Sequence, residues 1–114
     1  MLPVYPILAV PAVLAITSRI RQDEASPDEP APYVVWMRQA VVPENNLSDR
    51  QPGDRESIRV DVVARSEAQR DALTVACRDA VEARGHVLTI QSLGRDADTG
   101  FWRMTFDADV FHPR

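Results

Sequence analysis

A β-strand followed directly by an α-helix can be read from residues 57–69, SIRVDVVARSEAQ. Apolar side chains at Ile58, Val60 and Val62 alternate with polar ones, which is the period of a strand with one buried face. Ser66 then has the position of a helix N-cap, and Gln69 three residues later completes a capping box. An apolar stripe at helical spacing follows, made of Ala72, Leu73, Ala76, Cys77, Ala80 and Val81.

The other elements are placed by working outward from this strand and helix. The helix is expected to end at a glycine cap, Gly85. Prolines at 6 and 11 predict one kinked helix or two short ones over residues 6–16, with a break near Val10. Strands are expected at residues 18–22, 33–40, 57–65, 87–93 and 101–111, with a turn at 96–100. This order predicts an α+β fold: a largely antiparallel sheet of four to five strands, with an N-terminal helix and one long helix packed on it.

Length and composition restrict the classes of protein. The 114 residues fit one domain, 1–114, and 45% apolar with 26% charged residues excludes a disordered chain. All 13 basic residues are arginine, and 17 acidic residues bring the net charge to −4. The arginine bias fits a GC-rich coding sequence and also the preference for arginine at protein interfaces. Without a basic cluster, binding of a nucleic-acid backbone is not expected as the main role.

The sequence also bears on the compartment. A single cysteine, Cys77, cannot form an internal disulfide and fits a reducing cytoplasm. The apolar start, residues 2–16, has no basic leader, is interrupted by prolines and is shorter than the roughly 20 residues of a membrane span. We expect it to form helix that packs on the core, and not a signal or an anchor.

Residue types that carry chemistry do not converge in this sequence. His86 follows the long helix and His112 lies near the C-terminus, without the spacing of metal ligands. Cys77 lies on the apolar helix stripe, where a thiol is usually inert. Two aspartate pairs are expected to be solvated: Asp96 with Asp98 in a turn, and Asp107 with Asp109 on one strand face. Neither phosphate-binding glycine pattern is present. We therefore expect no enzymatic activity, no cofactor and no metal.

Three features suit assembly better than catalysis. Residues 42–54 form a polar hairpin connection longer than the usual two to five residues. Residues 23–32 are acidic and rich in proline, which predicts an extended surface loop. Phe101 and Phe111 lie off the apolar face of the last strand and are expected to form an exposed apolar patch. A subunit interface would gain more from such a patch than a monomer would.

Several short motifs occur in the order seen in a known family. Residues 7–15 (ILAVPAVLA) with Arg19 and Ile20 resemble its opening helix and short strand, and residues 32–36 (PYVVW) resemble its Pro-Tyr-Val-Val-aromatic strand. Residues 59–66 (RVDVVARS) resemble the strand that runs into its long helix. Residues 98–103 (DTGFWR) and 105–110 (TFDADV) resemble its Thr-Gly-aromatic turn and final strand. Taken together, the chain resembles the phage tail-completion family, also described as tail terminator or tail-to-head joining proteins.

The resemblance implies a structural virion subunit that forms a ring, expected to be a hexamer, which caps the tail tube and joins it to the head connector. Its partners would be further copies of itself, the tail tube protein and the head connector or stopper protein. DNA would pass through the lumen without specific binding, and no membrane would be involved. The ring would lie in the tail or neck of the virion after assembly in the cytoplasm of the host bacterium.

Ring closure needs a heterologous interface, in which two different surfaces of the subunit meet. The candidate segments are the hairpin loop Glu44 to Asp54 and the acidic loop Asp23 to Pro30. The candidate residues are Glu44, Asn45, Asn46, Arg50, Arg55, Arg59, Phe101 and Phe111.

Two other functions remain open from the sequence. Another neck or tail component, such as a head-completion or tube protein, fits the same features. A small ligand-binding α+β domain would need a pocket with converging polar groups, for which the sequence offers no candidate.

Overall fold

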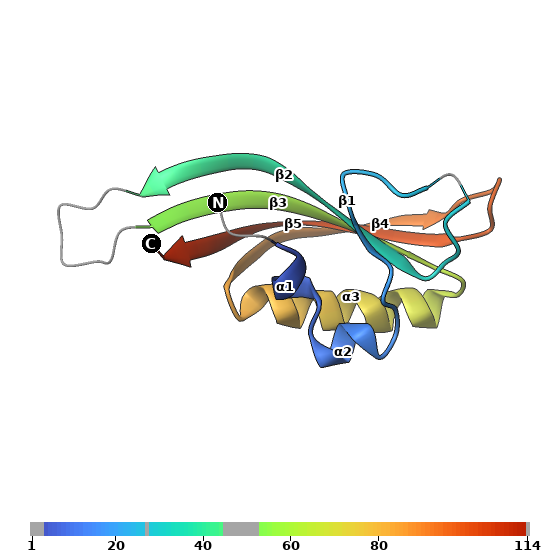
Figure 1. Cartoon of the computed structure of the whole chain (residues 1–114). Coiled ribbons are helices and arrows are strands. Elements are labelled where there is room, and N and C mark those ends of the chain that lie inside the picture. The colour runs from blue at the N-terminus through green and yellow to red at the C-terminus, as the bar shows by residue number, and fades with distance from the viewer. Residues whose placement is uncertain (1–3, 27, 45–52, 114) are drawn as a thin grey trace.

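A computed structural model describes residues 4–26, 28–44 and 53–113. It is an α+β fold in which a five-stranded sheet, in the order β1-β2-β3-β5-β4, carries all its helices on one face (Figure 1). The four long strands are antiparallel, and only β1 runs parallel to its neighbour β2. The predicted fold class is confirmed. Among the described residues, no helix has the length and apolar character needed to span a membrane.

The N-terminal segment forms two short helices, α1 (Tyr5–Leu8) and α2 (Pro11–Leu14), and not one kinked helix. The break falls at Val10, whose backbone is extended, because Pro11 disfavours helical geometry in the residue before it. Val4, Leu8 and Val13 are fully buried against the rest of the core.

The four long strands extend beyond their predicted ends, whereas the first strand, predicted at residues 18–22, is shorter. β1 (Ile20–Gln22) pairs with the start of β2 (Tyr33–Glu44), and β2 pairs along its length with β3 (Gly53–Ala64). Residues 42–44 and 53–54, which were expected to lie in the hairpin connection, therefore belong to strands. The remaining residues of that connection, 45–52, lie outside the described part of the chain.

The long helix α3 (Glu67–Glu82) begins as predicted. The Ser66 hydroxyl accepts a hydrogen bond from the backbone N–H of Gln69 at 3.1 Å, and the Gln69 side chain accepts one from the N–H of Arg65 at 3.0 Å. The predicted role of Gly85 is wrong, because the C-cap is Ala83 and Gly85 is the first residue of β4. Glycine is required there by a close approach: a Cβ at Gly85 would lie 1.9 Å from the carbonyl oxygen of Asp109.

A hairpin of β4 (Gly85–Arg95) and β5 (Trp102–Pro113) completes the sheet. The turn lies where it was predicted, with the Asp96 carboxylate accepting from the N–H of Asp98 at 2.8 Å and Gly100 at a φ of 76°. The largest fully buried side chain of the core is Phe106 on β5. It packs with Leu73 on α3 and Ile58 on β3, and each such side chain stabilises the fold by about 1.5–3 kcal/mol.

Candidate assembly surface

The cysteine and the possible metal ligands do not come together in a reactive site among the described residues. Cys77 is fully buried on α3, and burial raises the pKa of its thiol to about 12, so the nucleophilic thiolate does not form near neutral pH. Among the described residues, no cluster of three histidine, cysteine, aspartate or glutamate side chains could hold a metal ion. His86 is exposed on β4, beyond the end of α3.

The pair Asp107 and Asp109 is not simply solvated, contrary to the prediction. Asp107 accepts hydrogen bonds from Arg59 Nε on β3 at 3.0 Å and from the Thr89 hydroxyl on β4 at 3.3 Å. Asp109 accepts one from the Ser57 hydroxyl at 2.7 Å. The hydrogen bond to Asp107 also raises the pKa of Arg59. These carboxylates therefore link three neighbouring strands on the face of the sheet that lacks helices.

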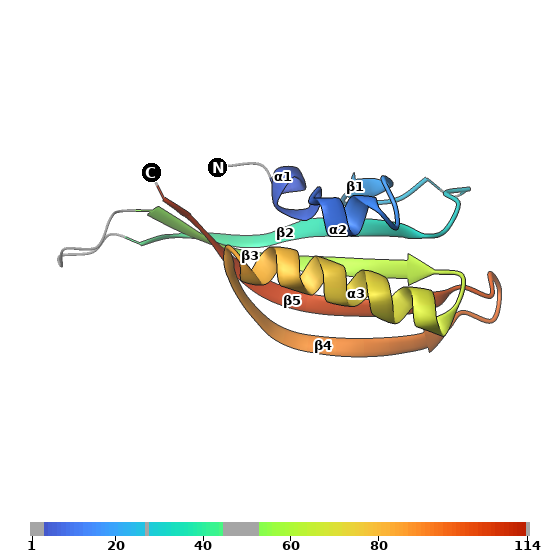
Figure 2. The same ribbon diagram turned by 90° about the horizontal axis from the view of Figure 1, so that it is seen from below.

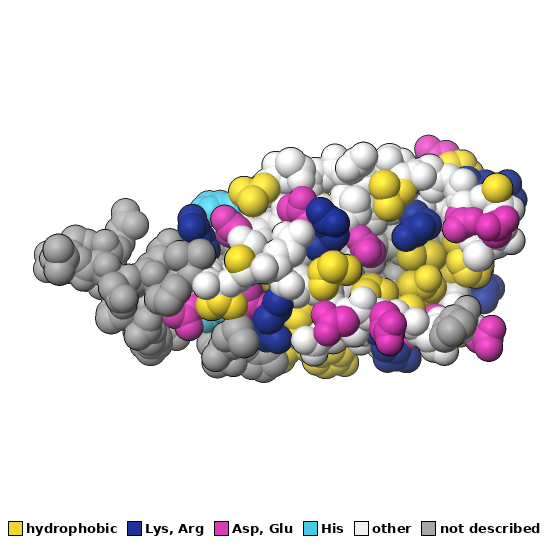
Figure 3. Space-filling view, turned by 90° about the horizontal axis from the view of Figure 1, so that it is seen from above, with side chains coloured by type: hydrophobic (Ala, Val, Ile, Leu, Met, Phe, Trp, Pro, Cys, Tyr) yellow, Lys and Arg dark blue, Asp and Glu magenta, His cyan; other side chains and the backbone are white. Residues whose placement is uncertain are grey.

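That uncovered face is polar and shallowly concave. Figure 3 shows it from above, with basic and acidic side chains lying beside hydrophobic ones. A depression of about 320 Å³ crosses β2, β3, β5 and β4, and charged groups from two strands line it: Arg59, Asp61, Arg103 and Asp107. The charges of opposite sign alternate, so this face has no strong preference for either an anion or a cation.

The structure brings together only some of the predicted interface residues. Arg55 lies opposite Phe111 in the pairing of β3 with β5, near the end of the sheet where Glu44 ends β2. Arg59 lies farther along β3, in its ion pair with Asp107. Asn45, Asn46 and Arg50 lie outside the described residues.

Phe101 and Phe111 do not form one apolar patch. They lie at opposite ends of β5, about 30 Å apart at the usual rise of a strand, and both are half-buried. Phe101 instead lines a depression beneath the acidic loop, together with Glu29 and Arg65.

The acidic loop, residues 23–32, is anchored to the body of the subunit at several points. Arg21 pairs with Glu29 at 2.6 Å, and Arg19 Nε donates to the carbonyl of Pro30 at 2.8 Å. From the connection between β3 and α3, Arg65 Nε donates to the carbonyl of Ala31 at 2.9 Å. These contacts hold residues 29–31 of the loop against the body of the subunit.

Sequence reasoning missed an exposed apolar edge on β4. This strand lies at one edge of the sheet (Figure 2), and each residue from Leu88 to Leu93 is exposed. Leu88, Ile90 and Leu93 are 58%, 42% and 46% exposed. The signal was present in the sequence, because residues 87–94, VLTIQSLG, contain no charged side chain. Sheet edges are usually protected by charges, and an uncharged edge indicates a pairing surface.

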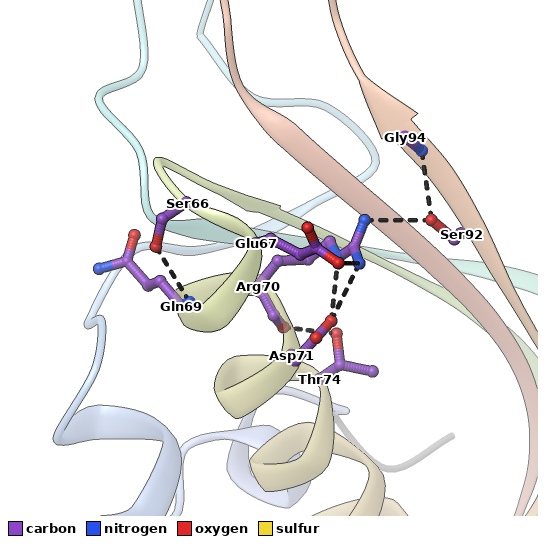
Figure 4. Close-up of polar contacts among 8 residues, drawn as sticks. All are labelled: Ser66, Glu67, Gln69, Arg70, Asp71, Thr74, Ser92 and Gly94. Atoms are coloured by element: carbon purple, nitrogen blue, oxygen red, sulfur yellow. Dashed lines mark hydrogen bonds and ion pairs between the residues drawn. The ribbon is translucent and has the colours of Figure 1, made fainter.

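Figure 4 shows how a side chain of α3 contacts β4 near its C-terminal end, at Ser92. Arg70, which is almost fully buried, donates to the Ser92 hydroxyl on β4 at 3.0 Å and to the Asp71 carboxylate at 3.1 Å. The same Ser92 oxygen accepts from the N–H of Gly94 at 3.3 Å. The Arg70 guanidinium also lies 5.5 Å from the centre of the Trp102 ring. These contacts keep the edge in a defined position.

A buried ionic cluster, also missed, lies at the opposite end of the sheet. Glu56 is fully buried, 2.6 Å from Arg38 Nε and 3.2 Å from His112 Nε2. The alternation of side chains along a strand could have revealed this cluster. Glu56 lies two residues from buried Ile58, and His112 lies two residues from buried Val110, so each is expected on the same buried face as that neighbour. The cluster joins β2, β3 and β5 near the end of the sheet at which β2 ends and β3 begins.

Comparison with protein families supplies the identification. Residues 6–112 match the family model described as Tail completion protein gp17. The chain belongs to this family. Comparison with curated protein sequences gives no significant match.

A solved structure shares the fold of this tail-completion family member. It is a chain in a structure titled "Virion of native gene transfer agent (GTA) particle", with 19% identity and a TM-score of 0.58. The match covers 97% of this chain and 92% of that one. The likeness to that chain concerns the fold, and family membership supports a structural role in a phage tail.

Proposed function

We propose that this protein is the tail terminator subunit of a phage, and that copies of it form a ring, most simply a hexamer, that caps the tail tube and joins it to the head connector. The family match over residues 6–112 carries the proposal. The ring lies at the head-proximal end of the tail and takes the tube protein on one side and the connector or stopper protein on the other. DNA passes through its lumen without specific contacts, which the net charge of −4 favours.

The shape of the subunit supports this role. The ends of β2, β3 and β5 project beyond the helices (Figure 1), and the buried cluster around Glu56 holds these three strands together. Arg55 and Phe111 lie on this projection, and residues 45–52 connect its strands. We place a contact with a neighbouring subunit or with the tube here, and a second contact at the anchored acidic loop near Phe101.

The decisive measurement is the mass of the full chain in solution by native mass spectrometry, combined with negative-stain microscopy. Closed rings of one size support the terminator role. Open tubes that lengthen with concentration would instead identify a tube protein. A chain that stays monomeric at every concentration and binds a metabolite would identify a ligand-binding domain.

The proposed role of the connection between β2 and β3 is tested by deleting residues 45–51. A matched control replaces the same residues with a Gly–Ser segment of equal length, which keeps the connection and removes the side chains. We expect both variants to fold, as judged by thermal unfolding, and to fail to assemble. If both still form rings and support normal virions, the loop is not part of the interface.

A further inference from the structure

The two long edges of the sheet differ, and among the described residues each has a side along which no further strand pairs. β4 forms one edge over its full length. At the other edge, β1 pairs only with residues 34–36 of β2, and no described strand pairs with the outer side of β2 beyond Trp36. Figure 2 shows β4 and β2 on opposite sides of the sheet.

We infer that the β4 edge of one subunit pairs with the outer edge of β2 in the next subunit, so that the sheets join around the ring. This inference rests on the proposed ring and names the interface that closes it. Two different edges meet at each contact, which is the heterologous arrangement that a ring requires. Backbone N–H and C=O groups of Thr89 to Ser92 on β4 and of Ala40 to Val42 on β2 that point away from the described neighbouring strand supply the hydrogen bonds.

The chain directions are compatible with this pairing. β2, β3, β5 and β4 are each antiparallel to their neighbour, so β4 runs opposite to β2 within one subunit. Subunits of a ring are related by rotation about a common axis and keep the same orientation along it. The β4 strand of one copy therefore meets β2 of the next in the antiparallel sense, which is the more stable pairing.

The two edges also match in length. Bulges at Leu88 and Leu93 leave Thr89 to Ser92 as the regular part of β4. On β2, a bulge between Arg38 and Ala40 starts a regular stretch that runs to Glu44. Bulges restrict an edge to short, defined partners and so prevent unlimited pairing.

The chemistry of the edges favours a second copy of this chain as the occupant. Residues 87–94 of β4 and residues 39–42 of β2, QAVV, contain no charged side chain, so pairing between these two segments desolvates no charge on them. Ile90 pairs with Phe106 and so shares the helix-covered face, whereas Leu93 lines the depression on the open face. The edge therefore offers apolar surface on both sides of the joined sheet.

Cysteine cross-linking tests the pairing directly. Ala40, Thr89 and Gln91 are exposed and lie on the open face, as their partners Ser57, Asp107 and Thr105 do. Ala40→Cys is combined with Thr89→Cys or with Gln91→Cys, and the assembled full chain is treated with a mild oxidant. The native Cys77 stays in place because it is buried.

We expect at least one of the two double variants to give a ladder of disulfide-linked subunits that ends at the ring size. Two controls use the same chemistry. Each single-cysteine variant, and Ala40→Cys with Ile90→Cys on opposite faces, should give no ladder, because a disulfide needs Cβ atoms about 4 Å apart. Dimers from the single Gln91→Cys variant would show that two β4 strands pair with each other, which overturns the inference.

A pair of lysine substitutions tests whether the edge contributes to affinity. Leu88→Lys places a charge on the edge, and Val75→Lys places one at an equally exposed apolar position on α3, 54% exposed. We expect Leu88→Lys to weaken assembly by at least about tenfold, the effect typical of an interface anchor, and Val75→Lys to leave it unchanged. Both variants should melt within a few degrees of the wild-type chain.

The outcomes separate this inference from the proposed function. Rings seen by microscopy with no cross-link in either open-face double variant, and with Leu88→Lys still assembling, would overturn the edge pairing and leave the terminator role intact. Absence of rings and of ladders in the unsubstituted and cysteine-bearing chains would overturn both.

Discussion

The substitution Gly85→Ala tests how closely β4 is joined to the body of the sheet. A Cβ at this position would lie 1.9 Å from the Asp109 carbonyl oxygen and 2.8 Å from the Cα of Val110. Ordinary van der Waals contact begins near 3.4 Å, so the two strands would have to separate by about 1.5 Å. The backbone hydrogen bond from Phe111 N–H to the Arg84 carbonyl, now 3.0 Å, lies at this junction and would be lengthened.

The expected magnitude follows from three contributions. Overpacking against backbone costs about 1–3 kcal/mol, a weakened hydrogen bond costs about 1 kcal/mol, and the reduced entropy of the unfolded chain returns about 0.4–1 kcal/mol. Gly85→Ala should therefore lower the free energy of unfolding by about 1.5–3 kcal/mol. For a chain of this size, that is a fall in Tm of roughly 5–15 °C.

Urea and thermal unfolding followed by circular dichroism measure this change, with Gly94→Ala as the matched control. A Cβ at Gly94 has nothing within 4 Å, and the cost there comes only from the left-handed backbone, φ 73°, at about 1 kcal/mol. Gly85→Ala should be clearly the more destabilising of the two. A Gly85→Ala protein as stable as the wild type would refute the close approach of β4 to β5.

Three further predictions concern buried polar and thiol groups. Glu56→Gln removes the buried carboxylate that faces Arg38 and should cost about 2–4 kcal/mol in urea unfolding; a change below about 0.5 kcal/mol would contradict a buried Arg38–Glu56 ion pair. Arg70→Ala should cost about 1.5–3 kcal/mol and speed amide exchange in β4, whereas Arg78→Ala, which breaks only an exposed pair, should cost about 0.5 kcal/mol or less. Cys77 should not react with a thiol reagent at pH 8 until the chain unfolds. Burial raises the pKa of the Cys77 thiol from 9.0 to about 12, so the buried neutral thiol contributes fully to the free energy of unfolding below pH 9. This contribution is lost as the pH rises toward 12, and Cys77→Ala should remove that pH-dependent loss.

Short sequence motifs predicted the positions of the helices and of the turn between β4 and β5. The Ser66 cap, the break before Pro11 and the turn at Asp96 each depend on hydrogen bonds or backbone limits within a few residues, so neighbouring residues were enough to predict them. The inert state of Cys77 followed in the same way, from its position on the apolar stripe of α3.

Strand ends and exposed edges were not predictable in this way. β2 continues beyond Ala40 through Pro43 because β3 and β5 extend with it and pair along its inner side. Proline is tolerated there because Pro43 lies one residue from the end of a strand at the edge of the subunit's sheet. The predicted patch of Phe101 and Phe111 was wrong, because the length of β5 separates these residues.

By itself, the sequence determined the α+β class, the helix positions and the alternation of faces along β3 and β5, because periodicity and capping are local properties. It did not determine the alternation along β4, where bulges at Leu88 and Leu93 change the face to which the following side chains point. It did not determine which strand lies at the edge. Strand order is decided when the strands pair across long distances in the chain, and this pairing places β5 between β3 and β4. Only the tertiary structure therefore turned the uncharged segment 87–94 into an exposed surface, and brought Arg38, Glu56 and His112 from three strands into one buried cluster.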